Sequence, residues 1–246
     1  MNSQLRDGLL MKTMMYDMLR KFLLCVALII GLTDSISAAP SNGTRFPRQW
    51  KIESGYQYNI MFERPLARSF GDLKTQDNFY TLSLGIFDWL SVDGQAGIGD
   101  VIERDGKLPK LEYNTGFAGG YGFRARVFEN EKWGLRAILG GQHTCVHPQA
   151  RSIDNDKYEA ILDDWQISAI IAKDFKPITV YTGISGSDCE LIYKLNKHDR
   201  KRVSSDSYIG LITGAELYLF DGKARIGAEG RFFSETALSV SASWLF

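Results

Sequence analysis

Apolar and polar residues alternate along most of the chain after residue 50. In the first such segment, Ile52, Tyr56 and Phe62 share one side of an extended chain, and Glu53 and Asn59 share the other. Side chains of a strand point alternately to its two faces, so a period of two predicts a strand with one apolar face. The alternation predicts about ten strands, at 51–63, 80–86, 90–98, 117–127, 133–142, 165–171, 180–185, 209–219, 225–232 and 238–246.

The connections between these segments alternate between short and long. Short turns are predicted at 87–89, 129–132, 173–177 and 220–223, and long polar loops at 65–77, 100–113, 146–159 and 191–206. The tight connection at 234–236 is the exception. Strands of about 10 to 14 residues match the length needed to cross a membrane, whereas strands of soluble sheets usually have about five or six.

Charged residues lie on the face opposite the apolar one. In a barrel of about ten strands, this places the charges in a narrow interior and the apolar face against lipid. Lipid offers no hydrogen bonds to the backbone, so the ring of strands must close. The predicted fold is therefore all-β: a closed antiparallel up-and-down transmembrane β-barrel of about ten strands, within a range of 8 to 12.

The interior charges have two interpretations. They line a narrow, mildly anion-preferring pore, or they pair with one another and plug a lumen too narrow for solutes. The residues of this lumen charge cluster are Arg124, Arg126, Arg136, Glu216, Arg225, Glu229 and Arg231.

The first part of the chain has the pattern of an export signal. Arg20 and Lys21 precede an apolar run at 22–32, and small residues follow as far as Ala38. The run is too short to span a bilayer as a helix, which needs about 20 residues. We expect residues 1–38 to be a cleaved signal peptide, 39–49 a short periplasmic N-terminal segment and 50–246 the barrel domain.

Whole-chain charge excludes one class of partner. Lys and Arg total 29, as do Asp and Glu, so no overall field favours nucleic acid. One predicted loop is locally basic, which suits the phosphates of lipopolysaccharide or simply a solvated loop. Its candidate anion-binding residues are Lys194, Lys197, Arg200, Lys201 and Arg202.

Taken together, these features resemble the bacterial outer-membrane β-barrel superfamily over residues 50–246. The likeness includes the final strand, which carries Val240, Trp244 and the terminal Phe246 on its apolar face. By this resemblance, the three residues form an assembly signal read by the outer-membrane assembly machinery. The resemblance also implies a porin-like monomer in the outer membrane of a Gram-negative cell, with periplasmic chaperones, outer-membrane lipid and lipopolysaccharide as partners.

Candidate chemistry is sparse. Lipid-A-modifying barrels place a His with Ser or Glu on their outer surface, and His143 falls on the lipid side near the outer rim without a partner at motif spacing. Asp163 and Asp164 are adjacent, so they point to opposite faces and cannot act together in a protease site. Cys145 and Cys189 lie on strands that are not neighbours, so a disulfide requires the loops to bend. No nucleotide-binding or zinc-binding motif is present, and no cofactor or metal is expected.

We therefore expect a structural, surface-contact or narrow passive channel role. One alternative is a rim enzyme acting on lipid A or peptides. A second is a secreted soluble β-sandwich that acts as a binding module. An enzyme needs two or three titratable side chains that converge on one point, which the structure can test.

Overall fold

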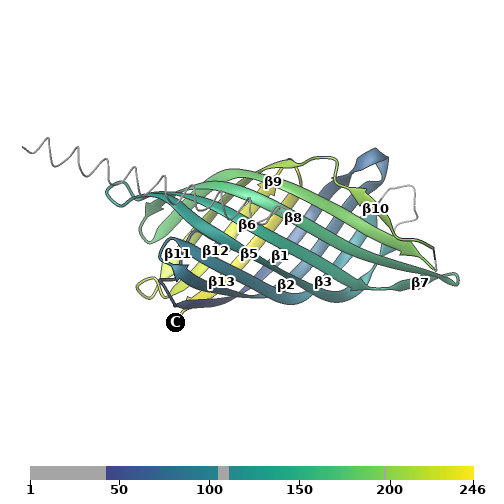
Figure 1. The fold of residues 1–246 in the computed structure, drawn as a ribbon, viewed down its shortest axis with the longest axis horizontal. Coiled ribbons are helices and arrows are strands. Elements are labelled where there is room, and N and C mark those ends of the chain that lie inside the picture. Colours follow the sequence, from purple (N-terminus) through teal and green to yellow (C-terminus); the bar gives the residue numbers. More distant parts are fainter. Residues whose placement is uncertain (1–42, 105–110, 197) are drawn as a thin grey trace, which may run out of the picture.

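The chain folds into one antiparallel sheet that closes on itself (Figure 1). In this computed structural model, the described residues are 43–104, 111–196 and 198–246. The long strands of the ring are β1 (Ile52–Leu66), β2 (Gly71–Phe87), β3 (Leu90–Arg104), β5 (Asn114–Asn130), β6 (Leu135–Gln149), β8 (Asp156–Phe175), β9 (Ile178–Leu195), β11 (Ile209–Leu219), β12 (Ala224–Phe232) and β13 (Thr236–Leu245). The predicted all-β barrel of about ten strands is confirmed.

The ring closes between its first and last strands. β1 pairs antiparallel with β13, with Tyr58 opposite Val240 and Glu53 opposite Leu245. The Phe246 N–H donates a hydrogen bond to the Ile52 carbonyl oxygen at 2.9 Å. A closed ring leaves no row of unpaired backbone groups, so the sheet can lie in lipid. The β-sandwich alternative, which needs two facing sheets, is wrong.

The two ends of the barrel differ in their connections. At the turn end, which also holds the C-terminus, the strands are joined at 88–89, 131–134, 176–177 and 220–223. At the opposite, loop end, a 3-10 turn (Ala67–Ser69) joins β1 to β2, and the short strands β4 (Leu111–Glu112), β7 (Arg151–Ile153) and β10 (Lys201–Ser204) extend other hairpins.

The long loops predicted at 65–77 and 146–159 are largely strand. β1 continues to Leu66 and β2 begins at Gly71, while β7 and β8 meet at a turn at 154–155. The apolar–polar pattern did not predict these strand ends. Strands are paired by backbone hydrogen bonds, and a hairpin that extends beyond the lipid needs no apolar face. Similarly, β9 continues to Leu195, and β10 pairs back along it.

The outward face carries the apolar half of each alternating strand. Tyr56, Ile167, Ile171 and Ile184 are 50% to 62% exposed. Their neighbours in sequence, such as Gln57, point inward and are buried. A continuous apolar surface of this kind is unfavourable in water and favourable against acyl chains, so the barrel is a transmembrane one.

Aromatic side chains edge the apolar face at both ends. On β8, Phe175 lies at the turn end and Trp165 lies about ten residues closer to the loop end. At about 3.3 Å per residue and a strand tilt of about 40°, this separation covers about 25 Å along the axis, the height of an outer-membrane apolar band. The turn-end girdle also includes Trp50, Phe87, Trp133, Phe220, Trp244 and Phe246, and the loop-end girdle Phe62, Phe117, Tyr121, Tyr208, Phe232 and Phe233.

Among the described residues, no helix is both long and apolar enough to cross a membrane.

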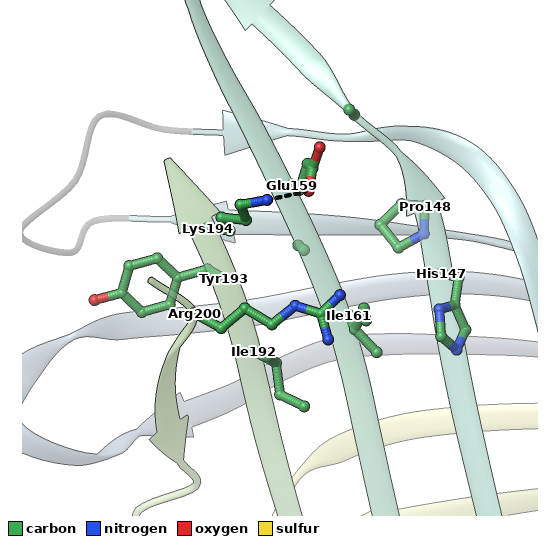
Figure 2. Close-up of a pocket in the computed structure, with 10 residues that line it drawn as sticks. His147, Pro148, Glu159, Ile161, Ile192, Tyr193, Lys194 and Arg200 are labelled. Carbon is green, nitrogen blue, oxygen red and sulfur yellow. Dashed lines mark ion pairs between the residues drawn. The ribbon is translucent and has the colours of Figure 1, made fainter. Parts of the chain in front are cut away.

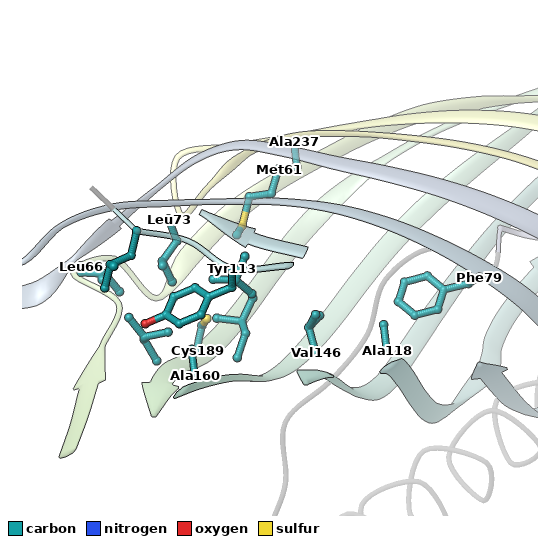
Figure 3. Packing of buried hydrophobic residues seen from close by; sticks show 14 residues of the cluster. Met61, Leu66, Leu73, Phe79, Tyr113, Ala118, Val146, Ala160, Cys189 and Ala237 are labelled. Carbon is teal, nitrogen blue, oxygen red and sulfur yellow. The ribbon is translucent and has the colours of Figure 1, made fainter. Parts of the chain in front are cut away.

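The interior is packed, and its two halves differ in chemistry. Toward the turn end it is mostly polar and charged, with a small apolar cluster beside Phe46 that consists of Ile138, Ile170, Ala172, Tyr181 and Ile212. Toward the loop end, buried side chains from many strands converge on one another, as Figure 3 shows. This loop-end core consists of Met61, Leu66, Leu73, Phe79, Val101, Leu111, Tyr113, Ala118, Val146, Ala160, Leu162, Cys189, Leu191 and Ala237.

Candidate functional site

Charged side chains pair inside the turn-end half of the barrel. Arg124 of β5 donates two parallel hydrogen bonds to Asp93 of β3, from Nε to Oδ2 at 2.8 Å and from Nη2 to Oδ1 at 2.9 Å. Each side chain is 4% exposed. A bidentate guanidinium–carboxylate pair is the arrangement in which attraction best offsets the cost of burying two charges.

The segment before β1, residues 43–47, lies inside the turn end of the barrel. Arg124 Nη1 donates to the backbone carbonyl oxygens of Gly43 at 2.8 Å and Arg45 at 2.9 Å. Gly43 has a φ of +77°, and a Cβ at this position would collide with the guanidinium of Arg225. Only glycine therefore fits where the segment enters the lumen.

Two carboxylates and two guanidiniums meet beside this segment. Arg225 contacts Glu216 (Nη1 to Oε1, 2.8 Å) and Glu53 (Nε to Oε1, 3.2 Å). Arg45 contacts the other oxygen of Glu53 at 2.8 Å, and the Thr44 N–H donates to Glu216 at 2.8 Å. The two negative and two positive charges alternate, so no excess of either sign faces the lumen here.

A second charged layer lies closer to the loop end. Arg64 Nη1 contacts Asp164 at 2.9 Å and Glu235 at 3.1 Å. Arg231 contacts the second oxygen of Glu235 at 2.9 Å and lies 3.9 Å from Glu229. This layer joins β1, β8, β12 and the β12–β13 turn across the interior.

Sequence reasoning missed Arg64 because strict alternation from Ile52 places residue 64 on the lipid side. A β-bulge between Met61 and Arg64 shifts the register of β1 against both of its neighbours. Phe62 and Glu63 are therefore both exposed, and Arg64 points inward with no exposed surface. The alternation of apolar residues does not reveal a bulge of this kind, so the inward position of Arg64 could not be predicted from it.

Two members of the predicted lumen charge cluster lie at its turn-end margin. Arg136 contacts Asp174 at 2.6 Å and donates to the Thr44 carbonyl oxygen at 3.0 Å, so it joins the network. Arg126 pairs locally with Glu129 at 2.9 Å, and its side chain is 20% exposed. The predicted charges therefore lie in two layers, with Glu229 and Arg231 in the one closer to the loop end. Arg126 lies at the rim of the turn-end layer, 5.6 Å from the centroid of the Phe46 ring.

The inward charges have almost no contact with water. Arg124, Glu216 and Glu229 are 4%, 1% and 2% exposed. A cavity between Glu216, Arg225 and Tyr181 has a volume of about 10 Å³, which is room for about one water molecule. Of the two interpretations of the lumen charges, the geometry matches paired charges that fill the interior.

The outward face holds a second cluster beside the loop-end girdle. His143 Nε2 on β6 lies 2.5 Å from Asp163 Oδ1 on β8. The His143 ring lies 4.2 Å from that of Trp165 and 5.3 Å from that of Tyr121, measured between centroids. Cys145, two residues further along β6, is directly opposite Asp163. An imidazole held by a carboxylate is the arrangement of a general base and its orienting group.

The sequence offers His143 no partner at motif spacing, and the partner in the structure, Asp163, lies 20 residues away at no such spacing. The partner lies on the next strand of the sheet, at a position that only the β6–β8 register reveals. The prediction that Asp163 and Asp164 face opposite sides is confirmed, because Asp164 points inward to Arg64. A paired-aspartate protease site at these two residues is therefore excluded.

The two cysteines of the barrel do not form a disulfide. Both Cys145 and Cys189 are free. Cys145 lies on the outward face of β6, and Cys189 is buried in the loop-end core on β9, with β8 between the two strands. In the described part of the chain, no group of three or more His, Cys, Asp or Glu residues is placed to hold a metal ion.

The extension of β9 and the strand β10 separate some residues of the predicted anion-binding loop, whereas Lys194 and Arg200 line one pocket. Lys194 ends 3.8 Å from Glu159, and Arg202 pairs with Glu190 at 3.0 Å. Lys201 is exposed at the start of β10, and Arg200 is exposed just before it. Lys197 lies outside the described residues.

The predicted assembly residues share the outward face of the last strand. Val240, Trp244 and Phe246 are 44%, 41% and 66% exposed. Trp244 lies 5.8 Å from the Phe220 ring, between centroids, within the turn-end girdle. Their position suits contact with lipid or with another protein at the turn end, and their role in assembly stays a prediction.

Solved structures with a similar fold belong to proteins with different activities. An outer-membrane channel from Pseudomonas putida F1 shares 11% identity, with a TM-score of 0.44 over 85% of this chain and 100% of that one. The outer-membrane protease OmpT from Escherichia coli shares 10% identity, with a TM-score of 0.41 over 84% and 100%. The translocator domain of the autotransporter NalP from Neisseria meningitidis shares 10% identity, with a TM-score of 0.40 over 80% and 87%.

Likenesses this distant do not identify an activity. No protein-family model matches the chain, and no curated protein matches its sequence. The fold assignment rests on the closed ring of strands and its apolar outward face, and the resemblance to outer-membrane β-barrels is confirmed at that level.

Proposed function

We propose that the chain is an integral outer-membrane protein with a sealed lumen, which acts through its outward and loop-end surfaces in a structural or surface-contact role. The observation that carries this proposal is the burial of inward charges that an open channel would hydrate. Arg64 and Glu216 are 0% and 1% exposed, and each contacts an opposite charge. The loop-end core adds an apolar layer across the same interior.

The orientation of the barrel follows from its connections. Outer-membrane barrels keep their short turns in the periplasm and their longer loops outside. The loop end, with β4, β7 and β10, then faces the exterior, and the loop-end girdle lies at the outer leaflet. In this orientation, outer-leaflet lipid and lipopolysaccharide are the immediate partners of the outward face. We expect a monomer, because the ring closes within one chain.

A sealed lumen predicts no steady ion conductance. Purified, folded protein reconstituted in a planar bilayer is expected to give no reproducible single-channel steps, because ions would have to displace the paired charges and the apolar loop-end core. An open porin in the same bilayer serves as the positive control, and a shift in gel mobility on heating verifies folding. Reproducible steps of uniform size would contradict the sealed lumen and restore the passive channel.

A second candidate function is that of a rim enzyme acting on membrane lipid. The contact of 2.5 Å between His143 and Asp163 favours it, because it supplies a base with its orienting carboxylate on the face turned toward lipid. Cys145 is the nearest nucleophilic residue along the same face of β6. We favour the surface-contact role because the dyad is only part of a catalytic set.

The enzyme candidate predicts the loss of activity in one histidine variant. If the folded protein releases fatty acid from acylated lipid in mixed micelles, His143→Ala is expected to lower the rate at least about 100-fold, the usual contribution of a general base. His198→Ala is the control, since His198 is exposed in the β9–β11 connection. Mass spectrometry of the lipid products measures the rate. Equal rates in both variants would exclude His143 as the base.

A further inference from the structure

A pocket opens on the outside of the barrel near the loop end. Its volume is about 220 Å³, and Figure 2 shows its lining from β6, β8, β9 and the segment before β10. Ile161 and Ile192 form an apolar floor, and His147 lies at one side. The Arg200 side chain extends over this floor toward Ile161 and His147 (Figure 2). The pocket therefore combines an apolar surface with a cation held above it.

The charges around the pocket favour an anion. Glu159 is the acidic residue of the lining, and Lys157 contacts it at 2.5 Å. Lys194 forms a longer ion pair with Glu159 at 3.8 Å, which Figure 2 marks with a dashed line. Among the described residues, the Arg200 guanidinium forms no ion pair. Glu159 carries one negative charge against the three positive charges of Lys157, Lys194 and Arg200, so this group of side chains keeps a net positive charge that favours a negatively charged ligand.

The height of the pocket matches the level of lipid headgroups. Ile161 lies four residues beyond Trp165 on β8, and His147 lies directly opposite Phe117 of the loop-end girdle, with the two ring centroids 6.4 Å apart. The pocket therefore starts at the loop-end edge of the girdle, at the level of Phe117. The headgroup layer of a bilayer lies just outside its hydrocarbon core, within about 5 to 8 Å. An anion bound here would sit directly above acyl chains that pack on the outward strands.

We propose that this pocket binds a phosphate group of an outer-leaflet lipid, with Arg200 and Lys194 contacting the phosphate and Ile161 and Ile192 contacting the start of the acyl region. The proposal rests on the proposed function because it places the loop end at the outer leaflet. A membrane lipid fits better than a soluble phosphate, because the pocket opens on the lipid-facing side and has an apolar floor. The His143–Asp163 pair lies beneath it on the same face.

Native mass spectrometry of the full folded chain in detergent micelles tests this proposal. The probes are bisphosphorylated lipid A and the same lipid after removal of its phosphates. The double variant Lys194→Gln/Arg200→Gln is expected to retain on the order of tenfold less phosphorylated lipid, as the loss of charge-assisted hydrogen bonds implies. The double variant Lys201→Gln/Arg202→Gln is the matched control, because it removes the same charge outside the pocket. It is expected to retain the lipid.

Three outcomes would overturn the proposal. Equal loss in both double variants would mean that overall charge, and no defined site, holds the lipid. Equal retention of the dephosphorylated lipid would exclude the phosphate as the recognised group. Displacement of the lipid by millimolar inorganic phosphate would identify a soluble anion as the ligand. Each variant must show the gel shift on heating. Steady conductance in the bilayer experiment would contradict the sealed lumen, but it would not affect the lipid-binding proposal if the Lys194→Gln/Arg200→Gln variant still lost phosphorylated lipid specifically.

Discussion

Replacing Arg124 with Met is expected to lower the free energy of unfolding by about 3 to 5 kcal/mol, the usual cost of breaking a buried ion pair. The change leaves the Asp93 carboxylate buried without its bidentate partner. It also removes the donor to the carbonyl oxygens of Gly43 and Arg45. Residues 43–47 are then expected to be held less tightly, by the remaining contacts of Thr44 with Glu216 and of Arg45 with Glu53. Urea denaturation of the folded barrel in lipid vesicles, followed by tryptophan fluorescence, measures the first effect. Trypsin cleavage after Arg45 measures the second.

Two controls distinguish the stability cost of leaving a buried charge unpaired from the cost of losing an arginine at any position. Arg202→Met removes an ion pair in which the arginine side chain is 66% exposed, and it is expected to cost less than about 1 kcal/mol. The double variant Arg124→Met/Asp93→Leu removes both buried charges, so it is expected to recover much of the stability lost in the single variant. A single variant as stable as the native chain would mean that water reaches this layer, which contradicts a sealed lumen.

Removing Phe246 is expected to lower the fraction of assembled barrel in the outer membrane several-fold. The terminal residue is 66% exposed on the outward face of β13, and its N–H bonds to Ile52 across the seam where the ring closes. Truncation therefore removes a hydrogen bond at the closing seam and, by the resemblance, the residue that the assembly machinery reads. The heat-modifiable band in outer-membrane fractions measures the assembled fraction.

Trp133→Ala is the matched control for this truncation. Trp133 is a turn-end girdle residue of similar exposure, 65%, but lies in the β5–β6 turn, away from the seam. If the two variants reduce assembly equally, Phe246 acts as a lipid anchor and the assembly-signal hypothesis is wrong. Refolding of the truncated chain in detergent adds a second test: normal refolding with poor assembly in cells would indicate recognition by the machinery, since the barrel then closes without Phe246.

The site was less predictable from the sequence than the fold. Glu216, Arg225, Glu229 and Arg231 were placed inward because they alternate with apolar residues, and each is buried there. Their partners could not be predicted. Arg64 reaches the interior only through a β-bulge, and its partner Asp164 lies on a strand far around the ring.

The outward dyad illustrates the same limit. His143 and Asp163 are 20 residues apart in sequence, and no motif spacing joins them. They meet because β6 and β8 pair with His143 opposite Trp165, which places Asp163 diagonally across. A shift of one residue in this register would turn one of the two side chains into the lumen.

The sequence by itself determined the fold class, the approximate strand number and, apart from the shift at the β1 bulge, which residues face lipid, because period-two alternation is a local property that each strand shows alone. The tertiary structure decided what those faces do. The strand register and the β1 bulge determine which charges meet. Residues 43–47 inside the lumen help to decide whether the interior is open, and the tertiary structure also brings Arg200 and Lys194 to one pocket. These features depend on contacts between segments that are distant in the chain. The energies of such contacts cannot be read from a local sequence pattern.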